Sequence, residues 1–349
     1  MAQSESPTPH GVLAGGNWIV DHVNMIDAWP PQDSLAMITD CFRGNGGCTY
    51  NLLKDLVRLE CGFPLAAVGL IGDDADGEWI LNDCRECGID SRSISKTPKA
   101  ATSFCQVMSV KTSGRRTFFS HAGANALLAE KDFDLIGSKA RIFHLGYLTL
   151  LDSLDALDAN GRTGASRLFE QAGKIGMLTV ADLVSKPEGD FSAVINPSLP
   201  WLDYLFLNEF EAARLLGIAL QEIEKGVSVA WLAESAQQIL KRGVRCAVII
   251  HTPAGAICAC REGGVFLQGP VRVPQEAIRG TAGAGDAFAA GCVLGIHEGW
   301  DYQAWLELGV CAAASSLGDA TCSGAIKPWR ECLREGRSRG FADFEISKL

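Results

Sequence analysis

Gly280-Thr281-Ala282-Gly283-Ala284-Gly285-Asp286-Ala287-Phe288-Ala289-Ala290-Gly291 is the stretch from which the organisation of the chain can be argued. A short β-type run, Val271-Arg272-Val273, precedes it, and an apolar helical pattern ending at Gly299 follows it. The pattern predicts a tight turn at Gly283, Ala284 and Gly285 that opens a helix. The first N–H groups of a helix lack intrahelical partners and carry the positive end of its dipole, so we expect an anion site here.

Asp286 lies in the first turn of this expected helix. The helix dipole favours a carboxylate there, and beside a bound phosphate the same group could accept the proton of an attacking hydroxyl. The residues alone leave both interpretations open. Two named phosphate motifs do not fit, because a P-loop needs Lys and Ser/Thr after its last glycine, and a dinucleotide fingerprint needs glycine where Phe288 stands.

The composition indicates a soluble, globular chain with a net negative charge. Of 349 residues, 47% are hydrophobic and 21% charged, and the net charge is −10. This charge argues against a nucleic-acid surface and means that a phosphate must be attracted by local dipoles, cations or a metal ion. No apolar run has the length of a membrane span, and residues 1–10 form an expected loose tail without a secretory pattern.

The thirteen cysteines are an odd number scattered among core-like segments, so we expect reduced thiols in a cytoplasm. Cys84-Arg85-Glu86-Cys87 is a C-x-x-C pair inside an expected helix. A second pair at zinc spacing is missing from the sequence, and helix packing is therefore favoured over metal binding.

Short apolar strands alternate with helical patterns along most of the chain. This alternation predicts a parallel sheet with crossover helices. The expected strands are at 63–70, 141–145, 177–180, 204–207 and 246–250, and the helices at 162–172, 209–216, 229–242 and 303–316. Strands at 100–110 and 115–119 flank the hairpin signal Thr112-Ser113-Gly114, and with residues 17–43 they are expected to form a small separate sheet.

Polar residues follow several of these strands. Asp21 comes after an expected first core strand at 12–20, which would place it at the ligand-binding edge of the sheet, although a turn-forming Asp fits equally. Gly44-Asn45-Gly46-Gly47 precedes an expected helix at 50–61 with Asn51 in its first turns. Asn51 offers a donor and an acceptor to a hydroxyl-rich ligand, but a helix cap remains the alternative.

Asn208 and Glu211 lie where the strand at 204–207 gives way to a helix, at the sheet edge expected to carry Asp286. An amide and a carboxylate beside a phosphate suit a hydrated Mg²⁺. The same pair, Asn as N-cap with Glu three residues later, is also a capping box in outline. The residues alone do not decide between the two.

Four stretches together resemble the ribokinase-like (PfkB) carbohydrate kinase family. They are Gly46-Gly47 with Asn51, His121-Ala122-Gly123-Ala124-Asn125, Asn208-Glu209-Phe210-Glu211 and Gly283-Ala284-Gly285-Asp286, in this order and spacing. The resemblance covers residues 11–335. It implies an α/β fold, with a doubly wound, mostly parallel sheet flanked by helices and a small β-sheet lid inserted at about 17–43 and 99–121; residues 336–349 would be a C-terminal extension.

The resemblance implies transfer of the γ-phosphoryl group of ATP to a hydroxyl of a small carbohydrate. Asp286 matches the catalytic base, and the backbone of Ala282, Gly283, Ala284 and Gly285 matches the anion hole. The remaining matches are sugar-binding positions (Asp21, Gly46, Gly47, Asn51, Asn125), nucleotide-binding positions (Asn208, Thr252, Gly255, Cys311), and Glu211 with Asn208 for Mg²⁺ through water. Sugar and ATP would be the partners, with no nucleic acid or membrane, and lid-to-lid homodimers are expected by analogy.

The sequence departs from the family pattern at four positions. Ile19 and Cys48 stand where ribokinases have Asn and Lys, so the sugar is left open. Pro253 removes a backbone donor from the nucleotide loop. Gly280 replaces the acidic residue that helps hold a monovalent cation in many relatives, which leaves potassium activation open.

Three other functions are alternatives to a sugar kinase. A nucleoside kinase of the same fold would differ in its acceptor. A non-catalytic sugar-binding homologue would bind ligand without turning over ATP. An NAD-linked oxidoreductase lacks its glycine fingerprint.

Overall fold

The structure is a computed structural model that describes residues 9–112, 115–184, 189–223, 226–319 and 321–344. The expected tail at 1–8 and the hairpin residues Ser113 and Gly114 lie outside the described residues. Among the described residues, no helix combines the length and the apolar character that crossing a bilayer requires.

A nine-stranded, mostly parallel sheet forms the main body, in the order β13-β12-β11-β10-β9-β8-β1-β4-β5. Its strands are β1 Val12–Gly16, β4 Leu65–Gly72, β5 Asp90–Thr97, β8 Ile142–Leu148, β9 Leu178–Leu183, β10 Tyr204–Asn208, β11 Ala247–Thr252, β12 Gly255–Cys260 and β13 Gly264–Gln268. Only β12 and β13 run antiparallel to their neighbours. The expected mostly parallel sheet is confirmed.

Helices cover both faces of this sheet, and alternate side chains of each strand feed two cores. Val12 and Ala14 of β1 lie in one core, and Leu13 lies in the other. The first core is covered by α1 Cys48–Arg58, α2 Ala75–Glu86, α9 Ala284–His297, α10 Tyr302–Ser316 and α11 Trp329–Arg339. The second is covered by α3 Asp152–Asp155, α4 Gly164–Lys174, α5 Phe191–Ile195, α6 Glu209–Leu216 and α8 Val229–Lys241, with α7 Leu220–Ile223 beside α6.

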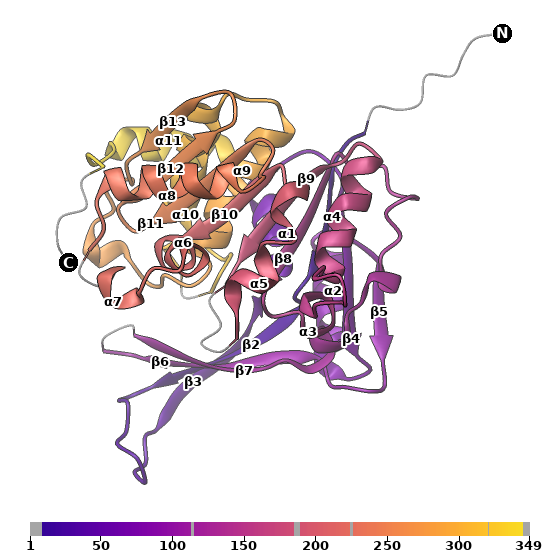
Figure 1. The fold of residues 1–349 in the computed structure, drawn as a ribbon. Helices are drawn as coiled ribbons and strands as arrows, with labels where there is room; N and C mark the ends of the chain where they lie inside the picture. The colour runs from indigo at the N-terminus through magenta and orange to yellow at the C-terminus, as the bar shows by residue number, and fades with distance from the viewer. Residues whose placement is uncertain (1–8, 113–114, 185–188, 224–225, 320, 345–349) are drawn as a thin grey trace.

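A separate four-stranded sheet projects from the body (Figure 1). Its order is β3-β2-β6-β7, from β2 Ile19–Ile26, β3 Ile38–Gly46, β6 Ser103–Val110 and β7 Arg116–His121. It has its own small core of Ile19, Val23, Cys105 and Val107. We call this sheet the lid.

The chain divides between the two sheets at Gly16, and this corrects the expected single strand at 12–20. Gly16 has φ 131°, and a Cβ there would lie 1.9 Å from the carbonyl oxygen of Gly146. Only glycine can pass this close to the neighbouring strand. β1 therefore ends at Gly16 and β2 begins in the lid, so Asp21 lies within a lid strand and not at the end of a core strand.

Three further boundaries differ from expectation. Val271-Arg272-Val273 is not a strand, because only Val271 forms a single bridge, with Phe341. Gly44 to Gly46 end strand β3 instead of forming a loop. Helix α11 runs across residue 335, the expected end of the domain, and packs on α10.

The strand order reverses between β1 and β8. From β1 the sheet continues to β4 and β5 on one side, and through β8 to β11 on the other. Ligands of open α/β sheets bind beyond the carboxyl ends of the strands at such a switch point. Residues that follow β1, β8 and β9 are therefore placed to meet a ligand.

Candidate active site

The predicted turn and helix at Gly283 are confirmed. Gly283 is the N-cap of α9 in the left-handed region, with φ 76°, and the helix begins at Ala284. A Cβ on Gly283 would lie 2.7 Å from that of Cys322, so both backbone conformation and space require glycine. Residues 282–285 are partly exposed, so the unpaired N–H groups of the first turn are open to an anion.

Asp286 is buried in the first turn of α9, with only 4% of its surface exposed. The Tyr147 hydroxyl donates to both of its carboxylate oxygens, at 2.7 and 2.9 Å, and the Asn51 amide donates to Oδ2 at 2.7 Å. Burial raises the pKa of Asp286 to about 6, against the opposing effect of these hydrogen bonds. A carboxylate with a pKa near neutrality is suited to general base catalysis.

Helix α1 presents Asn51 to this carboxylate. The Asn45 amide donates to the Asn51 side-chain oxygen at 2.7 Å, which turns the Asn51 amide nitrogen toward Asp286. Gly47 has φ 86°, and a Cβ there would lie 2.7 Å from the carbonyl oxygen of Asn17. The expected glycine-to-helix junction thus exists, with α1 beginning at Cys48.

Asp21 reaches the same region from the lid. Its Oδ1 lies 2.2 Å from where a Cβ of Gly46 would be, so the glycine makes room for the carboxylate. Burial raises the pKa of Asp21 to about 7, the charge of Asp286 adds to this rise, and Arg116 opposes it. The structure therefore brings Asp21, Gly46, Asn51 and Asp286 together.

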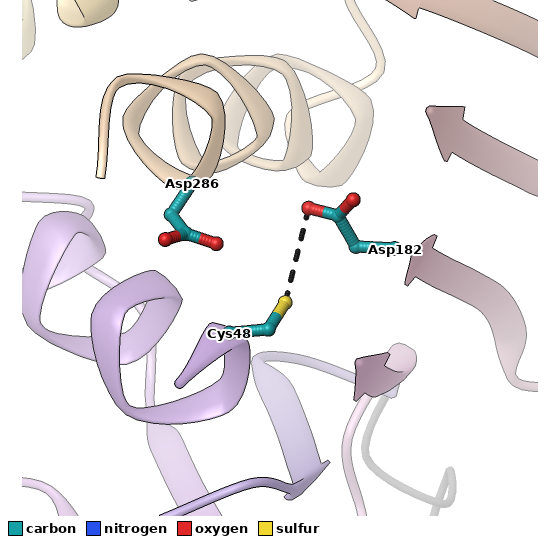
Figure 2. Close-up of side chains that lie close together, drawn as sticks. All are labelled: Cys48, Asp182 and Asp286. Atoms are coloured by element: carbon teal, nitrogen blue, oxygen red, sulfur yellow. Dashed lines mark hydrogen bonds between the residues drawn. The ribbon is translucent and has the colours of Figure 1, made fainter. Parts of the chain in front are cut away.

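Figure 2 shows Cys48, Asp182 and Asp286 pointing toward one another from α1, β9 and α9. Their ligand-type atoms all lie within 4.8 Å of one another. The Cys48 thiol donates to Asp182 Oδ2 at 3.8 Å, and its sulfur lies 3.6 Å from His144 Nε2. Burial raises the pKa of Cys48 well above its usual range, and the charge of Asp182 adds to this.

Asp182 was not among the residues selected from the sequence. Burial and then the charges of Asp286 and Glu211 raise its pKa well above the usual range. It lies near the carboxyl end of β9. The strand-end argument that selected Asn208 could have found it, because Asp182 follows the expected strand at 177–180.

Asn208 and Glu211 form the capping box that the sequence outlined. Asn208 Oδ1 accepts from the Glu211 N–H, and Glu211 Oε2 accepts from the Asn208 N–H, both at 2.9 Å. Glu211 is buried, with 3% exposed. The charge of Glu211 contributes to the raised pKa of Asp182, which lies near the carboxyl end of β9, while Glu211 follows the end of β10. Carboxylates placed in this way fit a divalent cation.

The expected nucleotide residues fall in two places. Thr252 and Gly255 close the β11–β12 hairpin, where Thr252 Oγ1 lies 3.2 Å from the Gly255 carbonyl oxygen. Cys311 instead lines a cavity of about 360 Å³. Among the described residues, the lining is Val271, Val273, Ala277, Cys311, Ala314, Ser315, Gly318, Ala325, Lys327, Cys332, Glu335, Gly336 and Arg339. The structure does not bring Thr252 or Gly255 into this lining.

Asn125 has a different environment from the other expected sugar-binding residues. Its side-chain oxygen accepts from the Trp18 N–H at 3.2 Å, and its amide donates to the Trp18 carbonyl at 3.3 Å. These bonds hold the short connection between β1 and the lid. Binding of substrate by Asn125 stays a prediction.

Tyr147 and Arg116 are the other site residues that the sequence did not indicate. Tyr147 lies near the carboxyl end of β8, at the switch point, and its N–H donates to the Asn17 side chain. Its hydroxyl meets Asp286 from 139 residues away. No local pattern marks such a contact.

Comparisons with known proteins agree with this arrangement. A structure of a ribokinase from Thermotoga maritima superposes with a TM-score of 0.76 at 19% identity, covering 94% of this chain and 99% of that one. A structure of an Arabidopsis thaliana ribokinase complexed with ribose and ATP gives the same TM-score, identity and coverage. At this identity the likeness establishes the fold: an α/β sheet flanked by helices with a smaller separate sheet.

Curated relatives carry kinase names. The chain is 25% identical to a 5-dehydro-2-deoxygluconokinase of Clostridium perfringens over 310 residues, which is 83% of this chain and 82% of the relative. It is also 25% identical to an adenosine kinase of Schizosaccharomyces pombe, covering 69% and 70%.

The protein is a phosphotransferase with an alcohol group as acceptor. More narrowly, the family description "pfkB family carbohydrate kinase" matches residues 16–330, and the chain belongs to that family.

Proposed function

We propose that this protein is an Mg²⁺-dependent kinase that transfers the γ-phosphoryl group of ATP to a hydroxyl of a small carbohydrate, with Asp286 as general base. The observation that carries the proposal is the position of Asp286. Its carboxylate lies in the first turn of α9, directly beside N–H groups that are open to an anion. Base and anion hole are thus held by one rigid element.

The acceptor hydroxyl would take the place of the Tyr147 hydroxyl at Asp286. In the structure the Tyr147 hydroxyl donates to both carboxylate oxygens and Asn51 to Oδ2 alone, so a substrate hydroxyl in the place of Tyr147 would have both oxygens available to accept its proton. Asn51 and Asp21 would hold neighbouring hydroxyls of the sugar, since both approach Asp286 from elements on either side of it. The backbone of residues 282–285 would receive the charge of the phosphoryl group.

Glu211 and Asp182 would hold Mg²⁺, with Asn208 fixing the orientation of Glu211. Such an ion neutralises charge on the nucleotide phosphates when bound. The base of the nucleotide would bind in the cavity lined by Cys311. Thr252 and Gly255 close the hairpin outside this lining, and nucleotide binding by these two residues stays a prediction. The thirteen unpaired cysteines favour a reducing compartment, and we place the enzyme in the cytoplasm.

An Asp286→Asn variant tests the proposal. It should stay folded and keep less than ~1% of the wild-type turnover, because a general base contributes ~10²–10⁴ in rate. Turnover is measured with ATP and Mg²⁺ across a panel of sugars, sugar acids and polyols. Asp301→Asn serves as a control, since Asp301 is the exposed N-cap of α10 and asparagine can still accept the hydrogen bond from the Ala304 N–H. Near-normal turnover by Asp286→Asn would remove Asp286 from the mechanism.

A nucleoside kinase is the second candidate. The relative named adenosine kinase favours it. The same acceptor panel, extended to nucleosides, separates the two functions by their kcat/KM values.

A further inference from the structure

A cationic side chain of the lid reaches the entrance of α9. Arg116 begins β7, where it pairs with Ser109 of β6. Its guanidinium lies against Gly280, just before the turn that opens α9: a Cβ on Gly280 would be 2.2 Å from Arg116 Nη2 and 3.1 Å from Cζ. Arg116 of the lid strand β7 and Gly280 of the segment before α9, which are 164 positions apart in the sequence, therefore meet here.

Space, and not backbone conformation, requires glycine at position 280. Gly280 is not among the residues with positive φ, unlike Gly283 in the same turn. A side chain is excluded only by its neighbours, the Arg116 guanidinium and the carbonyl oxygen of Asp319 at 2.8 Å. The absence of a Cβ thus forms a seat for Arg116.

Arg116 lies close to Ala282, the first residue of the expected anion hole, because both line the same cavity. Arg116 lines a small cavity together with Asp21, Asn45, Ala282 and Cys322. Among the described residues that line this cavity, Arg116 carries the only positive charge. The charge of Asp286 raises the pKa of both Asp21 and Asp182, so acidic side chains surround this region. An incoming phosphoryl group meets predominantly acidic side chains, so one cation at this point has a large effect.

We propose that Arg116, seated by Gly280, is the lid residue that binds the phosphoryl group as it moves to the acceptor. This rests on the proposed kinase function. In the transfer, a bond forms between the acceptor oxygen and phosphorus, the bond from phosphorus to the departing ADP oxygen breaks, and the acceptor proton passes to Asp286. Arg116 keeps its proton and stabilises the charge on the phosphoryl oxygens. Because Arg116 belongs to the lid, it can stabilise the phosphoryl group only when the lid lies over the body.

The role of Arg116 is tested by Arg116→Gln and Arg116→Lys. Arg116→Gln should lower kcat by ~10²–10³-fold, the loss found for a single transition-state donor, with little change in the KM of the acceptor. Arg116→Lys should recover part of kcat. Arg115→Gln, which removes a neighbouring exposed cation of the lid, should leave kcat within about twofold. If Arg116→Gln instead raises the acceptor KM with kcat unchanged, Arg116 recognises the acceptor and the proposal is overturned.

A double-mutant cycle tests the seat. Gly280→Ala should lower kcat in the wild type but have almost no further effect in the Arg116→Gln background, because the methyl group acts by displacing the guanidinium. An equal loss in both backgrounds would show that Gly280 serves the turn alone and would overturn the seat.

Hydrogen exchange gives a readout that needs no turnover. Backbone amides of β6 and β7 should exchange faster in Gly280→Ala and in Arg116→Gln than in wild type. In the double variant they should exchange no faster than in either single variant. Unchanged exchange in all three would contradict the seat. If the wild type phosphorylates no acceptor, the kinase function and the phosphoryl role both fall, whereas the exchange result still decides whether Gly280 seats Arg116.

Discussion

At the scale of single residues, the site depends on how far burial moves the proton affinity of its carboxyl groups. Burial of Asp286 would hold the carboxyl neutral if nothing opposed it, and the hydrogen bonds from Asn51 and Tyr147 oppose it. The balance leaves the pKa of Asp286 at about 6. About nine in ten molecules therefore carry a usable base at pH 7.

The activity should accordingly fall in acid. A base must be unprotonated to act, so we expect kcat/KM to be level above pH 7 and to fall tenfold per pH unit below about 6, the pKa of Asp286. Tyr147→Phe removes a hydrogen bond that lowers this pKa, and the acid limb should move to higher pH. The measurement is kcat/KM between pH 5 and 9. A limb below pH 4, or one that Tyr147→Phe leaves in place, would contradict the assignment.

Asp55 of α1 is a buried carboxyl group that the mechanism does not use. It is fully buried, and within the part of the chain that the structure describes neither carboxylate oxygen has a hydrogen bond of normal geometry, although the Ser323 hydroxyl is close enough to oppose the rise in its pKa. Burial raises the pKa of Asp55 well above its usual range. In the pH range between its unfolded and folded pKa values the folded state binds more protons, so the stability of the protein decreases as pH rises through that range.

Asp55→Asn removes this titration. We expect the variant to be more stable than wild type by ~1–3 kcal/mol at pH 8, with a difference that shrinks toward pH 5. Urea unfolding at both pH values measures this. Equal stability of the two proteins at pH 8, or a gain that does not depend on pH, would show that the burial of Asp55 does not lower the stability of the protein as the pH rises.

At the scale of elements, α6 shows how one motif can serve the fold and the chemistry together. The reciprocal hydrogen bonds of Asn208 and Glu211 begin the helix, and they also fix the Glu211 carboxylate at the end of β10. The structural and functional interpretations that the sequence left open are therefore compatible. Separating them requires a change that keeps the cap and removes the charge.

Glu211→Gln is that change, because its amide oxygen can still accept from the Asn208 N–H. We expect a loss of stability of no more than ~1 kcal/mol, but at least a tenfold higher Mg²⁺ concentration for half-maximal activity. Ser228→Ala, which removes the N-cap of α8, should lower stability to a similar extent without altering the Mg²⁺ requirement. A Mg²⁺ requirement unchanged in Glu211→Gln would leave Glu211 a helix cap only.

At the scale of the whole molecule, the lid is unusual in the apolar surface it leaves open. Large apolar side chains that are at least half exposed lie on its strands and on the connection between β2 and β3: Trp29, Leu35, Met37, Ile38, Phe118 and Phe119. Phe118 and Phe119 point to opposite faces of β7, and Phe118 lines the cavity beside Asp21, so the outer surface is formed around Phe119. Trp29 and Phe119 stack on each other with ring centroids 6.3 Å apart. Exposed apolar patches of this kind mark interaction sites.

We expect two copies of the chain to associate through this surface. The mass in solution should be twice 37.2 kDa. Phe119→Asp places a charge in the patch and should give the monomer mass, measured by sedimentation equilibrium. Ile136→Asp, at an exposed apolar residue of the main body, should leave the mass unchanged. A wild-type protein that is monomeric at all accessible concentrations would rule out this association.

The sequence by itself determined the elements whose signals are local. Helix α6 was predicted at 209–216 and is found at Glu209–Leu216, and the turn at Gly283 opens α9 as expected. Caps, glycine turns and apolar periodicity act over three or four residues, so they can be recognised without the fold. The edge strand β5 escaped recognition because its sequence, DSRSISKT, offers no apolar run.

Only the tertiary structure decided how these pieces meet. The separation of β1 from β2, and hence the place of Asp21, follows from Gly16 passing close to Gly146 on a distant strand. Asp286 receives Tyr147 from 139 residues away and Asn51 from 235. Such contacts are set by which strands pair and which helices pack between them, and these choices depend on the burial of the whole core. The motifs that carry most of the site residues can therefore be recognised from short stretches of sequence, whereas the way in which these residues come together is decided by the fold.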